Sequence, residues 1–191
     1  MLSDNLLNSL REPDVQTMET ERLLLRAPRL NDAQAIFDRY ASDPEVTRYL
    51  GWARHISLAE TRAFVKFSND QWSRWKTGPM LAISREQGVL LGTSGLMFET
   101  PSHASTGYVF ARDSWGQGYA TETLRAMVDL AARIGVERLT AECHADHYAS
   151  RHVMEKCGFQ QEHLLKRHAV FPNLSPDPQD VLLYSIAPPS R

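Results

Sequence analysis

The sequence contains 191 residues, a length that suits one domain with a sizeable core. Hydrophobic residues make up 42% and charged residues 23%, and the net charge is −2 without a block of like charge. This composition argues against a nucleic-acid-binding surface, and no apolar run approaches the ~20 residues that span a bilayer. Two cysteines give no disulfide framework, so we expect a cytoplasmic protein with neither a membrane nor a nucleic-acid partner.

The first 19 residues are predicted to form an extension that precedes the domain. Their mixture of charged residues and leucines is unlike a secretory signal. Four leucines would share one face of a helix that Ser3 could cap: Leu2, Leu6, Leu7 and Leu10. We expect the domain to occupy residues 20–187 and a short C-terminal tail to follow at 188–191.

In the first half of the domain we predict one strand and three helices. The strand covers 22–27, and the helices cover 31–41, 43–50 and 57–75. Asn31 is expected to cap the first helix, and Ser57 with Glu60 forms a capping box at the third. Aromatic residues recur along the third helix, and we expect them to pack in the core or an interface: Phe64, Phe67, Trp72 and Trp75.

The second half is predicted to contain most of the strands. Strands are expected at 80–84, 89–98, 107–111, 139–143, 160–166 and 181–185, and helices at 122–134 and 148–157. The segment 171–178 contains three prolines and is predicted to be a loop. This order favours a single α/β domain of the α+β type, with a mixed sheet covered by helices on both faces.

Two glycines, Gly116 and Gly118, stand where a strand is expected to lead into a helix. Glycine lets the backbone turn sharply there, and the unpaired N–H groups of the first helical turn would face a phosphate. The pair alone is weak evidence, because a plain strand-to-helix turn also needs glycine. It lacks the third glycine of a dinucleotide site and the Gly-Lys-Ser/Thr ending of a nucleotide-triphosphate loop.

The motifs around these glycines are more specific. Trp115-Gly116-x-Gly118-Tyr119-Ala120-Thr121-Glu122, followed by Ala149-Ser150-Arg151 and Gly158-Phe159, resembles the Gcn5-related N-acetyltransferases. Segments 20–26, 43–50 and 181–185 are similar to the branch that includes the ribosomal-protein N-terminal acetyltransferases. The resemblance runs from about residue 20 to 186 and implies a mostly antiparallel central sheet, splayed where the cofactor inserts.

The resemblance implies acetyl-coenzyme A (acetyl-CoA) as co-substrate, and no metal. The strand residues Val109, Phe110 and Ala111 would pair with the pantetheine arm. The pyrophosphate would be held by the loop and first turn: Trp115, Gly116, Gln117, Gly118, Tyr119, Ala120 and Thr121. His147 stands where many members carry a cofactor-contacting asparagine. For Trp115 the alternative is an aromatic residue packed at the sheet edge.

Ser150 is the group that the resemblance places near the coenzyme sulfur as proton donor, and the alternative is a hydrogen bond at the start of a helix. Ser105 occupies the position of the base glutamate of many members, and Met154 that of an acid tyrosine. The base is therefore left open among three candidates: Glu142, His144 and His103.

Tyr49, Gly51 and Trp52 match a family segment that lines the acceptor side, although they could form only a packed loop. The acceptor would be the α-amino group of a protein or peptide, or a small-molecule amine. The spacing of the cysteines and neighbouring histidines does not give a compact zinc pattern: Cys143, His144, His147, His152 and Cys157. We expect direct transfer without an acyl-enzyme, and a non-catalytic acyl-CoA-binding module is the alternative. A homodimer is left open.

Overall fold

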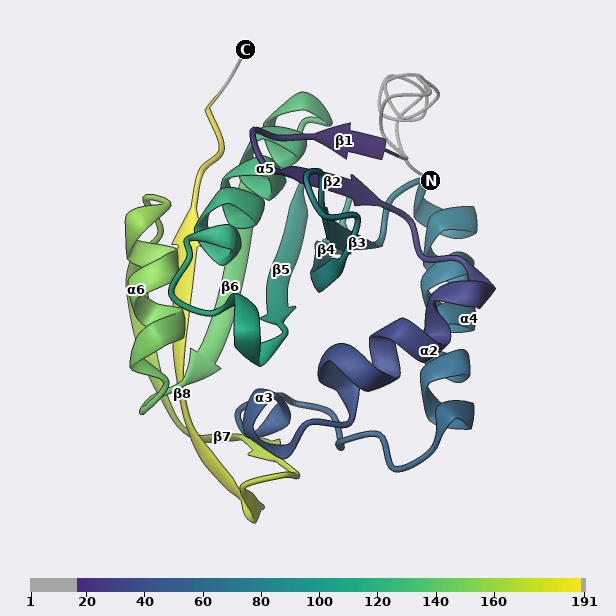
Figure 1. Ribbon diagram of the computed structural model, residues 1–191. Coiled ribbons are helices and arrows are strands. Elements are labelled where there is room, and N and C mark those ends of the chain that lie inside the picture. Colours follow the sequence, from purple (N-terminus) through teal and green to yellow (C-terminus); the bar gives the residue numbers. More distant parts are fainter. Residues whose placement is uncertain (1–16, 190–191) are drawn as a thin grey trace.

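The computed structural model describes residues 17–189, and one eight-stranded sheet organises them (Figure 1). The strands lie in the order β1-β2-β3-β4-β5-β6-β8-β7, and all neighbours are antiparallel except β5 and β6. Their bounds are β1 Thr17–Glu19, β2 Leu23–Arg26, β3 Pro79–Ser84, β4 Leu90–Thr100, β5 His103–Phe110, β6 Arg138–His144, β7 Gln160–Phe171 and β8 Ser175–Ile186. The predicted mixed, mostly antiparallel sheet is thus confirmed.

Helices cover both faces of this sheet (Figure 1). The helix α5 (Tyr119–Arg133) and the helix α6 (Tyr148–Lys156) pack into one apolar cluster with Phe110. Val109 points the opposite way, into a second cluster with α2 (Ala33–Ile36), α3 (Pro44–Thr47) and α4 (Leu58–Trp75). Adjacent strand residues face opposite sides of a sheet, so the two clusters lie on its two faces. No helix within residues 17–189 is long and apolar enough to cross a membrane.

Local sequence signals account for where the long helices begin. The Glu60 carboxylate accepts the N–H of Ser57 at 3.1 Å, which confirms the capping box before α4. Helix α5 begins three residues before the predicted Glu122, directly after Gly118, which has a left-handed φ of 83°. The glycine loop therefore runs straight into the first turn of α5.

The predicted helix at 31–41 exists, but its details differ. It combines a 3₁₀ turn at Leu30–Asp32, the helix α2, and a π-helical turn at Phe37–Ala41. Asn31 does not cap it, so that prediction was wrong. The cap position is Arg29, and Asp32 completes the turn three residues later, because its carboxylate accepts the N–H of Arg29 at 2.6 Å. Strand β1 was not predicted, since three residues carry too little alternation to be seen.

The loop predicted at 171–178 is also wrong. Only residues 172–174 lie outside strands there, and the segment forms the tip of a hairpin between β7 and β8. Pro176 and Pro178 fall where the register between the two strands shifts, and such bulges tolerate residues without an N–H group. The helix expected around the leucines of the N-terminal extension lies outside the described residues.

The feature that positions the site is a splay between β5 and β6. The two strands pair only from His103↔Arg138 to Thr106↔Ala141. Beyond this point β5 continues through residues 107–110 and pairs only with β4, while β6 continues through residues 142–144 and pairs only with β8. One edge of β5 is therefore open for a ligand, which confirms the splayed sheet.

Candidate active site

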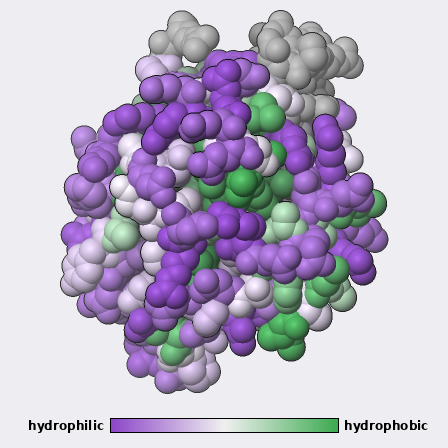
Figure 2. Space-filling view, in the orientation of Figure 1, coloured by the Kyte–Doolittle hydropathy of each residue, from purple (hydrophilic) through white to green (hydrophobic). Residues whose placement is uncertain are grey.

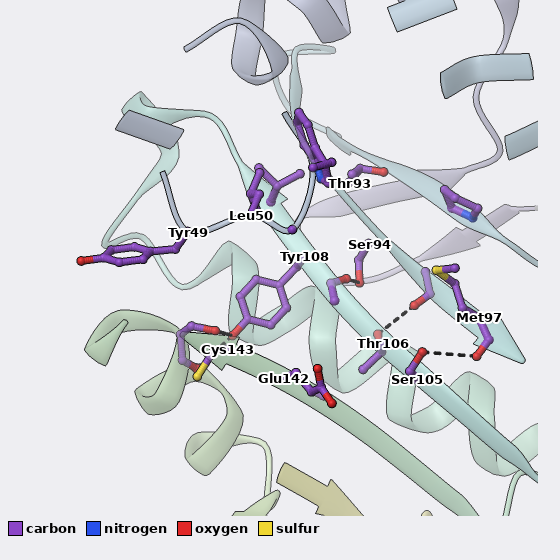
Figure 3. A pocket seen from close by; sticks show the side chains of 18 of the residues that line it. Tyr49, Leu50, Thr93, Ser94, Met97, Ser105, Thr106, Tyr108, Glu142 and Cys143 are labelled. Carbon is purple, nitrogen blue, oxygen red and sulfur yellow. Dashed lines mark hydrogen bonds between the residues drawn. The ribbon is translucent and has the colours of Figure 1, made fainter. Parts of the chain in front are cut away.

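The splay opens into a cavity of about 780 Å³. Strands β4, β5 and β6, helix α6, the segment 49–55 and the β7–β8 hairpin all contribute to its walls. Figure 2 shows hydrophobic side chains near the centre of the molecule's face, with hydrophilic side chains around them. In the close-up of Figure 3, Tyr108, Cys143 and Glu142 lie beside one another where the strands part.

The glycine loop presents unpaired donors at one end of the splay. Gly116 and Gly118 have φ values of 73° and 83°, a conformation that residues with a Cβ rarely adopt. No atom lies within 4 Å of a Cβ built on Gly116, so its backbone can be approached closely. The N–H groups of residues 116–121 have no acceptor among the described residues, and they stand at the positive end of the α5 dipole. This arrangement suits a phosphate.

The loop is braced from the N-terminal end of the domain. Glu122 accepts hydrogen bonds from the Thr20 hydroxyl and from the Arg22 backbone N–H and side chain. Arg22 also donates to the Gln117 carbonyl at 2.9 Å. Burial raises the pKa of Glu122, but the hydrogen bonds from Thr20 and Arg22 outweigh this and hold it below its ordinary value. Glu122 therefore fixes the first turn of α5 as an ionised carboxylate.

Ser150 lies in the first turn of α6, and its side chain reaches across the splay. Its Oγ is 2.9 Å from the Tyr108 hydroxyl, which also donates to the Ser150 carbonyl at 2.9 Å. Burial raises the pKa of Tyr108, so the phenol keeps its proton. Ser150 is thus partnered across the sheet rather than with the start of its own helix. No role was predicted for the side chain of Tyr108. The one sequence signal for it was its position on the strand that leads into the glycine loop.

His147 caps α6 and belongs to an aromatic stack that joins the two sides of the cavity. Its ring stacks on Tyr49 with centroids 4.7 Å apart, and His144 tilts against the same tyrosine at 5.0 Å. Burial, with the neighbouring His144, lowers the pKa of His147 to about 4. The ring is therefore neutral at physiological pH.

The three candidate bases end up in different places. Glu142 is the first residue of β6 beyond the last pair with β5, and it lines the cavity. His144 is buried and packs against Tyr49 and the edge of Phe171. His103 lies at the paired start of β5, away from the splay. Besides Glu142, the one other carboxylate in the lining is Glu99 at the end of β4, within the part of the chain described.

The two cysteines hold their protons. Burial raises the pKa of Cys143 to about 11 and also raises that of Cys157. A thiol that is not ionised is a weak nucleophile. Among residues 17–189 no group of three or more histidine, cysteine or acidic side chains is arranged to hold a metal ion.

The three residues predicted for the acceptor side all line the cavity. Tyr49, Gly51 and Trp52 follow α3, and Phe64 and Phe67 of α4 line the same cavity. The expectation that the aromatic residues of α4 pack in the core holds for Trp72, which is buried. Phe67 differs, because it lines the cavity and is 43% exposed.

Comparison with known proteins decides the family. The family model described as an acetyltransferase (GNAT) domain matches residues 22–160. The chain belongs to the GNAT acetyltransferase family. The uncharacterized N-acetyltransferase YoaA of Bacillus subtilis (strain 168) is 30% identical over 180 residues, covering 90% of this chain and 97% of that protein. This GNAT chain is thus an acyltransferase by family, and the resemblance seen in its motifs is confirmed.

Two solved structures show the same GNAT fold. The ribosomal α-N-protein acetyltransferase RimL, solved with coenzyme A disulfide-bonded to a cysteine, has a TM-score of 0.80 at 24% identity over 90% of this chain and 97% of its own. The spermidine N-acetyltransferase of Vibrio cholerae, solved with coenzyme A and spermine, has a TM-score of 0.75 at 18% identity over 88% and 97%.

The GNAT co-substrate is acetyl-CoA, and the residues present fit it. The unpaired N–H groups of residues 116–121 suit its pyrophosphate, and the open edge of β5 at residues 107–110 suits the amide groups of its pantetheine arm. The open edge leads from the glycine loop to the point where Glu142 and Ser150 meet the cavity.

Proposed function

We propose that the protein transfers an acetyl group directly from acetyl-CoA to a primary amine where β5 and β6 part. One observation carries this proposal. The open edge of β5 connects a phosphate-binding loop to a cavity that contains a carboxylate, Glu142, and a hydroxyl pair, Ser150 and Tyr108. The binding residues would be those of the edge and the loop, Val109 to Ala111 and Trp115 to Thr121, together with His147 and Ser150.

Each group has a task in this reaction. Bound acetyl-CoA supplies an acetyl thioester that is already activated. Glu142 takes a proton from the acceptor ammonium group, so that the neutral nitrogen can form a bond to the carbonyl carbon. Ser150 donates its proton to the sulfur as the carbon–sulfur bond breaks, and the second proton that the nitrogen loses on becoming an amide restores the Ser150 hydroxyl. The Tyr108 hydroxyl keeps its own proton and holds Ser150 in place. A free N–H group of residues 107–110 would stabilise the oxyanion.

We propose direct transfer because no cysteine near the site is ionised. The raised pKa values of Cys143 and Cys157 leave neither as a ready nucleophile. The acceptor amine would lie against Tyr49, Gly51 and Trp52. The names of the two solved relatives point to a protein N-terminus in one case and a polyamine in the other, and both acceptors are amines.

A non-catalytic acyl-CoA-binding module is the second candidate. Two substitutions relative to many family members favour it: Ser105 where a base glutamate is common, and His147 where an asparagine is common. Such a module would bind acetyl-CoA and release no free thiol with any amine.

The matched carboxylates of the cavity provide the test. Glu142→Gln should lower kcat by about 100-fold or more with the best acceptor, since a positioned base contributes that much, and leave acetyl-CoA affinity unchanged. Glu99→Gln alters the same cavity away from the splay and should change kcat by less than about threefold. Equal turnover in the Glu142→Gln enzyme would remove Glu142 from the mechanism.

A further inference from the structure

The acceptor end of the cavity has apolar walls. The large apolar side chains that line the cavity include Leu50, Trp52, Phe64, Phe67 and Met97. Phe67 and Met97, which both line the cavity, are 43% and 50% exposed. An apolar ligand placed here would remove their surfaces from water.

The charges of this end are few. Among the described lining residues, Glu99 and Glu142 alone bear a charge, because burial lowers the pKa of both His55 and His147 and leaves these rings neutral. With Glu142 occupied by the reacting nitrogen, one carboxylate would remain for any second ammonium group. Glu99 could pair one further ammonium group, but a polyamine with three nitrogens, such as spermidine, would bury a charge without a partner, which is costly.

These observations extend the proposed function, on which they rest, to a class of acceptor. We propose that the acceptor is an amine with one apolar group of about aromatic size, and not a polyamine. The aromatic walls would bind this group while the nitrogen faces Glu142. A small-molecule amine and a peptide with an apolar first side chain share this chemistry.

An amine series tests this class. Propylamine, hexylamine, phenethylamine and spermidine are offered with acetyl-CoA, beside peptides that begin with phenylalanine or serine. We expect kcat/KM to rise about fourfold for each buried methylene group and spermidine to be acetylated at least roughly tenfold less efficiently than hexylamine. Preference for phenethylamine over the phenylalanine peptide would indicate a small-molecule acceptor, and the reverse a peptide.

Variants of the wall make the test specific. Phe67→Ala should lower kcat/KM for phenethylamine about tenfold and leave propylamine nearly unchanged. Leu164→Ala, on the exposed face of β7, is the control. A kcat/KM that does not change along the amine series, or one that is highest for spermidine, would overturn the proposed class of acceptor. If no amine is acetylated, the proposed function fails, and calorimetry with phenethylamine in the presence of coenzyme A then tests the acceptor class by itself. Phenethylamine binding to the wild type that is lost in Phe67→Ala upholds the class. No phenethylamine binding to the wild type overturns it.

A second inference concerns the tip of the β7–β8 hairpin. The Asn173 side chain donates to the carbonyl oxygens of Thr47 and Trp52, each at 2.8 Å, and accepts the N–H of Arg54 at 2.7 Å. One amide thus binds three backbone groups that span the segment between α3 and α4. A carboxylate could not do this, because it has no proton to donate at neutral pH.

The segment and the hairpin share the cavity. The three backbone groups flank Tyr49, Gly51 and Trp52, which line its acceptor end. Phe171, at the end of β7, lines the same cavity and meets His144 edge-on at 5.0 Å. Apart from Asn173, the hydrogen bonds from segment 47–54 to other described residues go only to the chain just before it. Thr47 donates to the Asp43 carbonyl through its N–H and its hydroxyl, and the Arg54 guanidinium donates to the Ser42 carbonyl.

We propose that Asn173 is a positioning residue that fixes the acceptor wall, so that the β7–β8 hairpin determines which amine fits. This inference depends on the proposed function only for its kinetic readout. The structural readout is amide hydrogen exchange of residues 47–54, which can be measured whether or not an acceptor is known.

Three variants test the positioning role. Asn173→Ala and Asn173→Asp should raise hydrogen exchange in residues 47–54 about tenfold or more, because the first removes the amide and the second turns a carboxylate toward two carbonyl oxygens. Both should raise KM for the acceptor about tenfold, with kcat and acetyl-CoA affinity changed less than about twofold. Gln179→Ala, whose amide bonds only within the hairpin, should behave like the wild type. Unchanged exchange in Asn173→Ala would overturn the inference.

Discussion

At the scale of single residues, the hydrogen bond between the Ser150 and Tyr108 hydroxyl groups is the contact most important to the proposed reaction. It joins helix α6 to strand β5 where the sheet opens, and desolvation raises the pKa of Tyr108, so the phenol keeps its proton. A serine hydroxyl is a weak acid alone. The hydrogen bond to Tyr108 fixes the orientation of this hydroxyl, so that its proton can be aimed at the departing sulfur.

Ser150→Ala should therefore reduce kcat about 100-fold while the affinity for acetyl-CoA changes little, since the lost group acts on the departing sulfur. Tyr108→Phe should show a smaller loss, about tenfold, because Ser150 keeps its own proton. Steady-state kinetics and calorimetry separate the two effects. Full turnover in Ser150→Ala would exclude the serine from proton transfer.

Glu122 shows how a residue outside the cavity supports the site. Its folded-state pKa lies below the ordinary 4.5, so its stabilising effect is fully present above pH 4.5 and is lost as the pH falls through the folded value. Glu122→Gln should lower the free energy of unfolding by about 1 to 3 kcal/mol at pH 7. Urea unfolding at several pH values measures this, and the gap to the wild type should narrow below pH 4.5. A difference in the free energy of unfolding that does not change with pH would contradict a stabilising role for the ionised Glu122.

At the scale of elements, the glycine loop is the part with the most specific conformation. Gly118→Val should weaken acetyl-CoA binding about 100-fold or more, because its φ of 83° and its place before α5 both require glycine. Gly88→Val is a matched control, since Gly88 also has a positive φ, of 68°, but lies in the β3–β4 turn. It should lower stability and leave affinity unchanged. Equal affinity in both variants would contradict the phosphate role of the loop.

Elements with a strong local signal were predicted well. The capping box of α4, the glycines before α5 and the apolar spacing of α5 all depend on neighbours within a few residues. The failures were also local in origin. Prolines at 172, 176 and 178 indicated a loop, but the β7–β8 pairing overrides them through register shifts. Asn31 has the right chemistry for a cap, but the helical segment already begins at Leu30. The carboxylate of Asp32 therefore binds the N–H of the cap residue Arg29.

At the scale of the whole molecule, the site is built from contacts between distant parts of the chain. The position of Ser150 could be predicted from its motif, but its partner Tyr108 is 42 residues away. Asn173 lies 126 residues from Thr47, and no periodicity connects them. Glu142 was one candidate base among three, and only the register of β5 and β6 places it at the splay, where we propose that it acts. Sequence patterns report local structure, and such pairings follow only from the topology of the sheet.

The central claim is direct transfer of an acetyl group to an amine at the splay between β5 and β6. The measurement that tests it most directly is the release of free coenzyme A from acetyl-CoA with and without an amine, with product and intact protein followed by mass spectrometry. We predict release that depends on the amine, one acetylated amine for each coenzyme A, and no acetylated protein. Release without amine together with an acetylated cysteine, or tight binding without any release, would contradict the account.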